Sequence, residues 1–394
     1  MPRHKPGGRA ARGGRQTVPV RFPDDVPTLT DGTVTLRAHA VPDLPRIVEQ
    51  CRDPESIAWT TVPTPYDEQD ARDWIGTVVP AGWEGDSTYC FAIEHDGCFA
   101  GSVDLRMKGG GEGELGFGLH PDARGDGLMR RALMLLLDWG FERHGLAVVQ
   151  WRAFTGNWAS RRTVWGLGFS FGPTVPQLLP HRGERRDAWT GWIGAADARE
   201  PVEPWLVPPV LEADGVRLRA WCETDGPGLV EAANDPTVRQ WIPDSPLPRE
   251  PGEVPGYLLR VHQAAATNAR MAWCVADAES DAPLGNVALF EFEEDGDDLT
   301  AQVGYWSLPA GRGRGAMTTA LRTATDWALR RRGDGGFGAR RLYLLTSPRN
   351  LPSRALAERA GFTHVGTERG SGPLAGGGYE DSALYDRLRD APEG

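Results

Sequence analysis

Hydrophobic and polar positions alternate over several short stretches in a way that predicts a sheet before the first long helix. Residues 34–37 alternate with the period of two that a half-buried strand requires. Residues 90–94 and 98–105 are two further strand candidates, and between them lies His95-Asp96-Gly97, whose Asp-Gly pair is a strong hairpin signal. Residues 114–119 form the next candidate strand. These patterns predict strands that are joined by tight turns.

Segments with helical periodicity lie between and after these strand candidates in the sequence. Residues 43–50 predict a helix that Asp53-Pro54 ends. After a glycine-bearing loop at 124–127, an apolar face recurs at helical spacing, formed by Leu128, Ala132, Leu135, Leu136 and Trp139. Residues 147–153 then read as a strand, and 160–167 as a second helix with Gly168 at its C-cap. The pattern indicates a mixed α/β domain with the glycine loop between a strand and a long helix.

The chain repeats these landmarks in the same order. Residues 34–38 match 216–220 and Asp53-Pro54 matches Asp235-Pro236, both at a spacing of 182 positions. Residues 121–139 match 309–327 at a spacing of 188, and 157–169 match 350–362 at a spacing of 193. Ordered landmarks with slowly growing spacing indicate a duplicated fold over nearly the whole chain.

The duplication predicts the domain organisation. We expect domains at 27–198 and 211–391, which suits a chain of 394 residues. The stretch 199–210 is rich in proline and therefore favours an extended linker. Residues 1–26 begin with a basic, glycine-rich segment, which predicts a disordered tail; a weak contact with nucleic acid or the ribosome is the alternative.

Composition narrows the classes of partner. A net charge of −11 argues against a general phosphate-neutralising surface, so nucleic acid is not the expected partner of the folded domains. The five cysteines lie far apart, without metal-ligand spacing, and predict free thiols and no metal. No apolar run approaches the ~20 residues of a membrane span, so we expect a cytoplasmic protein without a membrane partner.

The loop Arg-Gly-x-Gly, which leads directly into a helix in both copies, carries the candidate chemistry. Its glycines allow close approach, and the N–H groups of the helix N-terminus favour an anion. The predicted phosphate-binding residues are Arg124, Gly125, Asp126, Gly127, Leu128 and Met129, and Arg312, Gly313, Arg314, Gly315, Ala316 and Met317. A Rossmann dinucleotide loop is excluded because Ala123 replaces the opening glycine and Arg331 stands near the place of the acidic ribose partner.

The order of these motifs resembles the Gcn5-related N-acetyltransferase (GNAT) superfamily. Gly116-Phe117-Gly118 and Gly304-Tyr305-Trp306 precede the loops, and Asn-x-x-Ser-Arg and Gly-Phe follow them. The Asp-Pro landmark with its following Trp, and the closing segments 186–189 and 380–385, are similar to the ribosomal-protein-alanine N-acetyltransferase branch. The resemblance covers about 27–198 and 211–391.

The resemblance implies two tandem GNAT-type domains, each a mixed, mostly antiparallel sheet flanked by helices. It also implies acetyl-CoA as the acyl donor, with the pantetheine arm between two splayed central strands and the pyrophosphate on the glycine loops. Asn157 and Asn350 match the family asparagine that contacts the CoA arm. The family usually has Gly or Ala at the sixth loop position, so Met129 and Met317 predict a narrower loop.

The expected reaction is direct attack of a neutral amine on the thioester, without a cysteine nucleophile. The tyrosine that serves many relatives as general acid is replaced by Val164 and Ala357, which leaves Ser160 and Ser353 as hydroxyl candidates, or else as helix N-caps.

Glu114 is the first candidate base, and a solvated carboxylate at a strand end is its alternative interpretation. Its counterpart Gln302 cannot accept a proton, although Glu291 or Glu293 could substitute. The negative Asp126 and the positive Arg314 favour the second loop as the better site for a pyrophosphate.

The sequence thus predicts an acetyl-CoA-dependent N-acetyltransferase that acts on a primary amine: a protein N-terminus, a lysine or a small molecule, including an antibiotic. The acceptor pocket is expected from loops such as 59–66 and 241–249. The alternative is a non-catalytic acyl-CoA-binding or regulatory protein with degenerate domains. Which copy is active, and whether the chain forms a homodimer, stay open.

Overall fold

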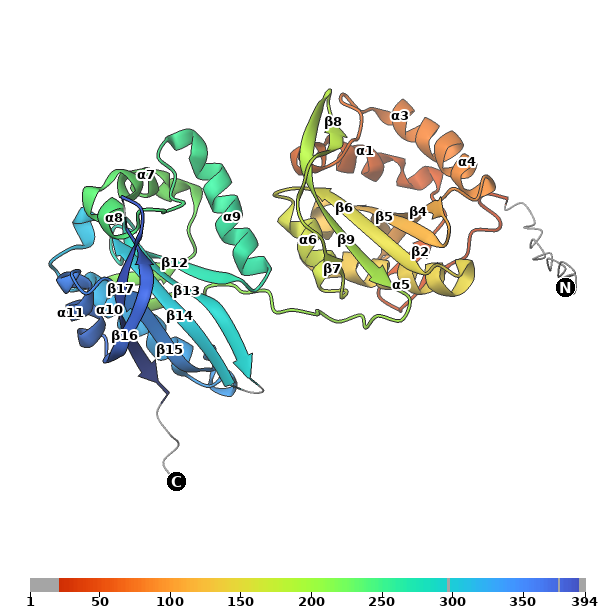
Figure 1. The fold of residues 1–394 in the computed structure, drawn as a ribbon. Helices are drawn as coiled ribbons and strands as arrows, with labels where there is room; N and C mark the ends of the chain where they lie inside the picture. The colour runs from red at the N-terminus through yellow and green to blue at the C-terminus, as the bar shows by residue number, and fades with distance from the viewer. Residues whose placement is uncertain (1–20, 296–297, 375, 390–394) are drawn as a thin grey trace, which may run out of the picture. The chain divides into compact units, whose positions relative to one another are not determined.

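The chain folds into two compact units, residues 1–202 and 203–394 (Figure 1). The structure, a computed structural model, describes residues 21–295, 298–374 and 376–389. Most of the predicted tail therefore lies outside the described residues. In the described segments, no helix is long and apolar enough to cross a membrane.

The N-terminal unit is built on a nine-stranded sheet in the order β1-β2-β3-β4-β5-β6-β9-β7, with β8 paired to β9. The neighbouring strands are antiparallel except β5 and β6, which are parallel. The strands are β1 Leu29–Thr30, β2 Thr35–Arg37, β3 Thr88–His95, β4 Cys98–Gly109, β5 Glu112–Leu119, β6 Val148–Phe154, β7 Ser170–Phe171, β8 Val175–His181 and β9 Glu184–Gly194.

The helices of this unit begin and end where capping residues and prolines allow. Asp53 ends one helix and caps the next, because Pro54 has no N–H to lose at the first helical position and the Asp53 carboxylate accepts the Ser56 N–H. The helices are α1 Leu44–Arg52, α2 Pro54–Trp59, α3 Glu68–Asp73, a π-helical turn at Trp74–Val78, α4 Val79–Glu84, α5 Leu128–His144 and α6 Trp158–Trp165, with short 3₁₀ turns at Val41–Asp43 and Pro121–Ala123.

The C-terminal unit repeats this plan with an eight-stranded sheet in the order β10-β11-β12-β13-β14-β15-β17-β16. Its strands are β10 Leu211–Ala213, β11 Val216–Arg219, β12 Arg270–Asp277, β13 Pro283–Asp295, β14 Asp298–Ser307, β15 Ala339–Thr346, β16 Thr363–Pro373 and β17 Tyr379–Leu388. Its helices are α7 Gly226–Asn234, α8 Pro236–Trp241, α9 Val254–Ala266, α10 Ala316–Leu329 and α11 Leu351–Arg359, with 3₁₀ turns at Glu223–Asp225, Pro251–Glu253, Pro309–Gly311 and Arg332–Asp334. The predicted fold class, two mixed, mostly antiparallel sheets flanked by helices, is confirmed.

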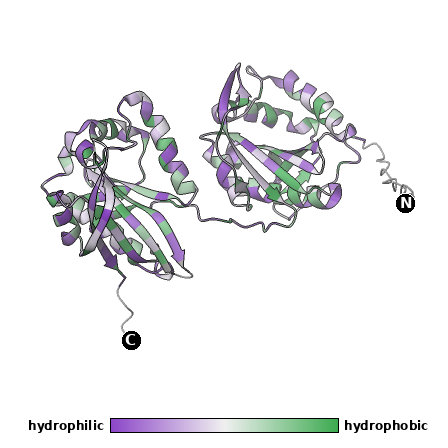
Figure 2. Cartoon of the chain, in the orientation of Figure 1, coloured by the Kyte–Doolittle hydropathy of each residue, from purple (hydrophilic) through white to green (hydrophobic). Residues whose placement is uncertain are grey.

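Each sheet separates two layers of helices, and alternate strand residues serve the two faces. In the C-terminal unit Ala301 and Val303 pack with α10 and α11, whereas Ala288 and Trp306 pack with α7 and α9 on the other face. Figure 2 shows the same segregation, with hydrophobic residues on the strands and inner helix faces and hydrophilic residues on the outer helix faces. This alternation decides which side chains share a face with the candidate site.

The single parallel strand pair of each unit opens partway along its length. In the N-terminal unit the register between β5 and β6 runs from Glu112↔Val148 to Glu114↔Gln150 and stops there. In the C-terminal unit the register between β14 and β15 stops at Gln302↔Tyr343. Both strands of each pair continue beyond these residues, so a V-shaped opening, which we call the V, separates them. The splayed pair that the family resemblance implies is therefore present twice.

Two details of the sequence interpretation need correction. Helix α6 ends at Trp165 with Gly166 as its C-cap, and Gly168 adopts its left-handed φ of 83° only in the following turn. The helical region between 54 and 84, which holds α2 to α4, was missed because its apolar positions follow short, proline-interrupted segments instead of one long period.

Candidate functional site

The Arg-Gly-x-Gly loops present uncapped helix N-termini. Gly127 and Gly315 are the N-cap residues of α5 and α10, both are left-handed (φ of 73° and 83°), and neither helix receives a side-chain cap. A Cβ at Gly125, Gly127, Gly313 or Gly315 would meet no atom within 4 Å. The first N–H groups of each helix therefore face open space in a geometry that suits a phosphate.

The arginine that opens each loop anchors the loop to the Asp-Pro landmark. Arg312 donates to Asp235 Oδ1 at 2.6 Å and Oδ2 at 3.1 Å, and to the Ser307 carbonyl at 2.8 Å. Arg124 in the same way donates to Asp53 at 2.7 Å and pairs with Glu55. The guanidinium groups that were predicted to bind phosphate thus form ion pairs with carboxylates in this structure.

The two loop methionines do not narrow the loops. Met129 and Met317 are 6% and 4% exposed, and the Met317 side chain packs beside Gly285 in the core. Their neighbours Leu128 and Ala316 are buried as well. The bulk that predicted a narrower loop thus points into the protein, because the first turn of each helix turns these side chains towards the sheet.

Asn157 and Asn350 are the N-caps of α6 and α11, which corrects the alternative interpretation of the serines as caps. Asn157 Oδ1 accepts the Ser160 N–H at 3.1 Å, and Asn350 Oδ1 accepts the Ser353 N–H at 3.2 Å. Capping uses the amide oxygen, so the side-chain NH₂ group is the part that could donate to a pantetheine carbonyl. Ser160 Oγ itself accepts the Trp151 Nε1–H at 3.0 Å.

Ser353 belongs to a chain of hydroxyl groups that the sequence alone did not reveal. Its Oγ lies 2.9 Å from Tyr305 Oη and 3.0 Å from Thr346 Oγ1. Tyr305 lies on β14 and Thr346 on β15, so the chain links the two strands across the V of the C-terminal unit through α11. Burial raises the pKa of Tyr305 to about 12, which keeps the phenol protonated.

Glu114, the first candidate base, is enclosed by cations. Its side chain is 7% exposed and lies 3.1 Å from Lys108 Nζ and 3.4 Å from Arg106 Nη1, and it also pairs with Arg152. Arginine and lysine side chains thus engage both carboxylate oxygens. These ion pairs compete with a substrate amine for both oxygens.

Asp104, which the sequence interpretation missed, lies closer to the V. It stands opposite Gly116 in the β4–β5 register. Gly116 lies two residues beyond Glu114, which is the last residue of β5 that pairs with β6. A Cβ at Gly116 would collide with the Asp104 carboxylate, so the glycine of this motif makes room for the acid. Burial raises the pKa of Asp104 although Arg106 Nε lies 2.8 Å away. A carboxylate with a raised pKa is a better general base.

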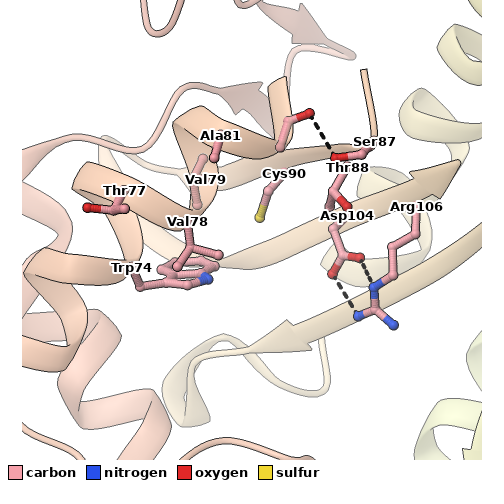
Figure 3. A pocket seen from close by; sticks show the side chains of 11 residues that line it. Trp74, Thr77, Val78, Val79, Ala81, Ser87, Thr88, Cys90, Asp104 and Arg106 are labelled. Carbon is pink, nitrogen blue, oxygen red and sulfur yellow. Dashed lines mark hydrogen bonds and ion pairs between the residues drawn. The ribbon is translucent and has the colours of Figure 1, made fainter. Parts of the chain in front are cut away.

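Asp104 and Arg106 line a cavity of about 630 Å³ between the sheet and the segment 74–82 (Figure 3). Figure 3 shows the ion pair on one side and Trp74 and Val78 from the π-helical turn on the other. The cavity is thus lined mainly by residues of helices and strands. Cys90 also faces it, and burial raises the pKa of this thiol well above its ordinary value, which argues against a thiolate nucleophile.

The C-terminal unit has different residues at the equivalent positions. Its register places Ala288 opposite Gly304 and Phe290 opposite Gln302, where the N-terminal unit has Asp104 opposite Gly116 and Arg106 opposite Glu114. The candidate base Glu291 is exposed, has a φ of 52° and accepts the Tyr343 hydroxyl at 3.0 Å.

The remaining predicted residues lie near the loops or the sheet end. Asp126 and Arg314 are both exposed in their loops, and Arg314 lies 3.9 Å from Asp277. Glu293 is exposed on β13, opposite Thr300. No group of three or more potential metal ligands occurs among the residues that the structure describes.

Comparison with known proteins gives one family and many similar folds. The family model "Acetyltransferase (GNAT) domain" matches twice, at 33–170 and 216–363. Ribosomal-protein-S5-alanine acetyltransferase from Vibrio fischeri is 19% identical, with 48% of this chain and 100% of that chain covered and a TM-score of 0.39. RimJ from Mycobacterium smegmatis, solved with CoA-disulfide, is 22% identical, with 44% and 88% covered and a TM-score of 0.38.

A GNAT-family acetyltransferase from Bacillus anthracis is 16% identical, with 46% and 100% covered and a TM-score of 0.39. Each of these structures corresponds to less than half of this chain. The search of curated proteins finds no match to the sequence.

Proposed function

Because the chain belongs to the GNAT acetyltransferase family, we propose that it transfers an acetyl group from acetyl-CoA directly to a primary amine, and that the N-terminal unit carries the reaction. The observation that supports this assignment is the Asp104 carboxylate, packed on Gly116 where β5 leaves β6. A carboxylate at this place lies over Gly116, just beyond the last β5 residue that pairs with β6, and it also lines the cavity.

Both units have the features that CoA requires. The uncapped N-termini of α5 and α10 would hold the pyrophosphate through backbone N–H groups. The side-chain NH₂ groups of Asn157 and Asn350 would donate to the pantetheine arm. Bound acetyl-CoA would supply an activated thioester, which needs no metal and no covalent enzyme intermediate.

The residues of the N-terminal unit then account for the proton transfers. As the amine nitrogen bonds to the acetyl carbon and the carbon–sulfur bond breaks, the nitrogen loses a proton to Asp104. The departing thiolate takes up a proton from water, and Ser160, whose Oγ accepts from Trp151, would stabilise the sulfur by donating a hydrogen bond to it. Arg106 holds Asp104 in place through charge, and Glu114 positions the same guanidinium from its other side.

CoA release tests the proposal directly. The full-length protein is incubated with acetyl-CoA and a panel of amines, and free thiol is measured with time. We expect amine-dependent release that Asp104→Asn reduces roughly a hundredfold or more, the lower end of what a general base contributes. Glu291→Gln is the matched change in the C-terminal unit and should leave the rate unaltered. A rate that depends on Glu291 and not on Asp104 would assign the reaction to the other unit.

A second candidate function applies to the C-terminal unit. Ala288 and Gln302 stand where the N-terminal unit has Asp104 and Glu114, so this unit fits a CoA-binding role without transfer. Binding of acetyl-CoA that persists without amine-dependent release, in protein whose first site is silenced by Gly127→Glu, would support that role. Protein N-termini, lysines and small molecules all remain in the panel as acceptors.

A further inference from the structure

We infer that the cavity beside Asp104 is the acceptor site and that it selects a small amine on an apolar, uncharged body, such as an arylalkylamine. This inference rests on the proposed function, since it assumes that Asp104 is the base. It adds the chemical class of the acceptor and the segment that recognises it.

The wall of the cavity that faces the sheet is apolar. Trp74, Val78, Val79 and Ala81 contribute to it, and Thr77 and Ser87 also line the cavity. A cavity of about 630 Å³ lies within the range of ~300–1,000 Å³ that small-molecule sites occupy. An apolar ligand body gains free energy here by leaving water, whereas a charged body would be desolvated without a partner.

The charges of the cavity are confined to its floor. Asp104 and Arg106 are the only ionisable side chains other than Cys90 among its lining residues, and they pair with each other at 2.8 Å. A diamine or polyamine would need a second carboxylate for its distal ammonium group, and an acidic acceptor would need a second cation. The lining residues offer neither, so a single amine at Asp104 is the charge pattern that fits.

The π-helical turn shapes the apolar wall. Trp74, Thr77 and Val78 of the turn Trp74–Val78 all line the cavity. Turns of this kind are costly relative to an α-helical turn and are frequent at functional sites. Val78 is 59% exposed, so a change there alters the rim of the cavity without opening the core.

Calorimetry with 2-phenylethylamine, 1,4-diaminobutane and a short peptide with a free N-terminus tests the inference on the full-length protein saturated with CoA. We expect phenylethylamine to bind at least tenfold more tightly than the other two. Val78→Asp should weaken that binding at least tenfold and strengthen binding of the diamine. Val202→Asp, the same change at a valine that is 71% exposed and outside the cavity, should alter neither.

Equal or tighter binding of the diamine or the peptide would overturn the inference, as would an unchanged affinity for phenylethylamine in Val78→Asp. The CoA-release assay separates the two ideas. Phenylethylamine that binds in a Val78-dependent manner without releasing CoA would refute the transfer reaction and leave the acceptor site in place. Release of CoA with other amines that does not depend on Val78 would support the transfer reaction and refute the acceptor site.

Discussion

Asp235 and Arg312 lie 77 positions apart and form a two-pronged ion pair that fastens the glycine loop of the C-terminal unit to the start of α8. The Asp235 carboxylate also accepts the N–H groups of Thr237 and Val238, so one side chain caps a helix and holds the loop. Asp53 and Arg124 repeat the relationship in the N-terminal unit. The Asp-Pro landmark and the Arg-Gly-x-Gly loop are therefore two halves of one structural device.

Removal of this anchor should weaken binding of CoA. Asp235→Ala leaves Arg312 without its carboxylate, and we expect the affinity of the C-terminal unit to fall about tenfold, as for loss of one charge-assisted interaction of ~1.5 kcal/mol. Calorimetry in a Gly127→Glu background, which removes the first site, measures it. Glu212→Ala breaks the exposed pair with Arg217 and serves as the control. Unchanged affinity in Asp235→Ala would show that the loop is held by other contacts.

The hydrogen bonds from Arg312 keep the pKa of Asp235 below its ordinary value of 3.8, although burial opposes them. A carboxylate with a depressed folded-state pKa contributes stability that is fully present above the unfolded value and is lost as the pH falls through the folded value. The anchor should therefore stay intact throughout the neutral and mildly acidic range. A loss of CoA affinity that follows the protonation of a group near pH 6 would have to arise from a residue other than Asp235.

A negative charge at the loop glycine should abolish CoA binding in its own unit. In Gly315→Glu the new carboxylate stands at the helix N-terminus where the pyrophosphate would bind, and like charges repel there. We expect at least a hundredfold loss by calorimetry in protein whose first site is silenced by Gly127→Glu. Gly335→Glu is the matched control, because Gly335 has a similar φ of 77° and equally open surroundings away from the loop. Equal losses from both changes would indicate a general effect of backbone strain.

The acid limb of the pH–rate profile should report Asp104. A base works only when it is deprotonated, and burial raises the pKa of this carboxyl group above 3.8. The value of kcat/KM should therefore fall as the pH decreases through that raised pKa, earlier than an ordinary aspartate would require. In Asp104→Asn the limb should disappear together with most of the rate, whereas Glu114→Gln should keep the limb and shift it. A profile that Asp104→Asn leaves unchanged excludes Asp104 as the base.

The N-terminal unit should lose stability in mild acid sooner than the C-terminal unit. His39 is 4% exposed, and burial lowers its pKa to about 3, whereas an unfolded histidine titrates near 6.5. Between these two pKa values the unfolded state binds more protons than the folded state. The contribution of the neutral His39 ring to the free energy of unfolding is therefore fully present above pH 6.5 and decreases as the pH falls. The equivalent residue of the other unit is Trp221, which does not titrate.

Urea unfolding at pH 7.5 and 5.5 measures this difference in the intact chain. A brief alkylation pulse at a fixed pH labels Cys90 or Cys274 only when its unit is unfolded, because both thiols are buried. We expect the midpoint for Cys90 to move to lower urea at pH 5.5 by more than the midpoint for Cys274. His39→Gln, which keeps a hydrogen-bonding group for Ser102 Oγ, should remove most of the excess shift. Identical shifts for both thiols would contradict the prediction.

The sequence by itself determined the duplication, the fold class and the position of the two glycine loops. These features depend on residues whose backbone roles are local: Gly127 and Gly315 need a left-handed conformation, and Asp53 with Pro54 ends one helix and starts another. Local chemistry of this kind is visible in a linear pattern because each residue acts on its immediate neighbours in the chain. The order of the landmarks then identified the family.

Only the tertiary structure decided which side chains meet. Asp104 lies in the middle of an ordinary strand pattern, and its importance comes from Gly116 on the next strand and from the helices that bury it. Glu114 was a reasonable base by position, yet Lys108, Arg106 and Arg152 converge on it from two strands. Burial and the charges of partners distant in sequence set the reactivity of a carboxyl group, and neither quantity is encoded in local spacing.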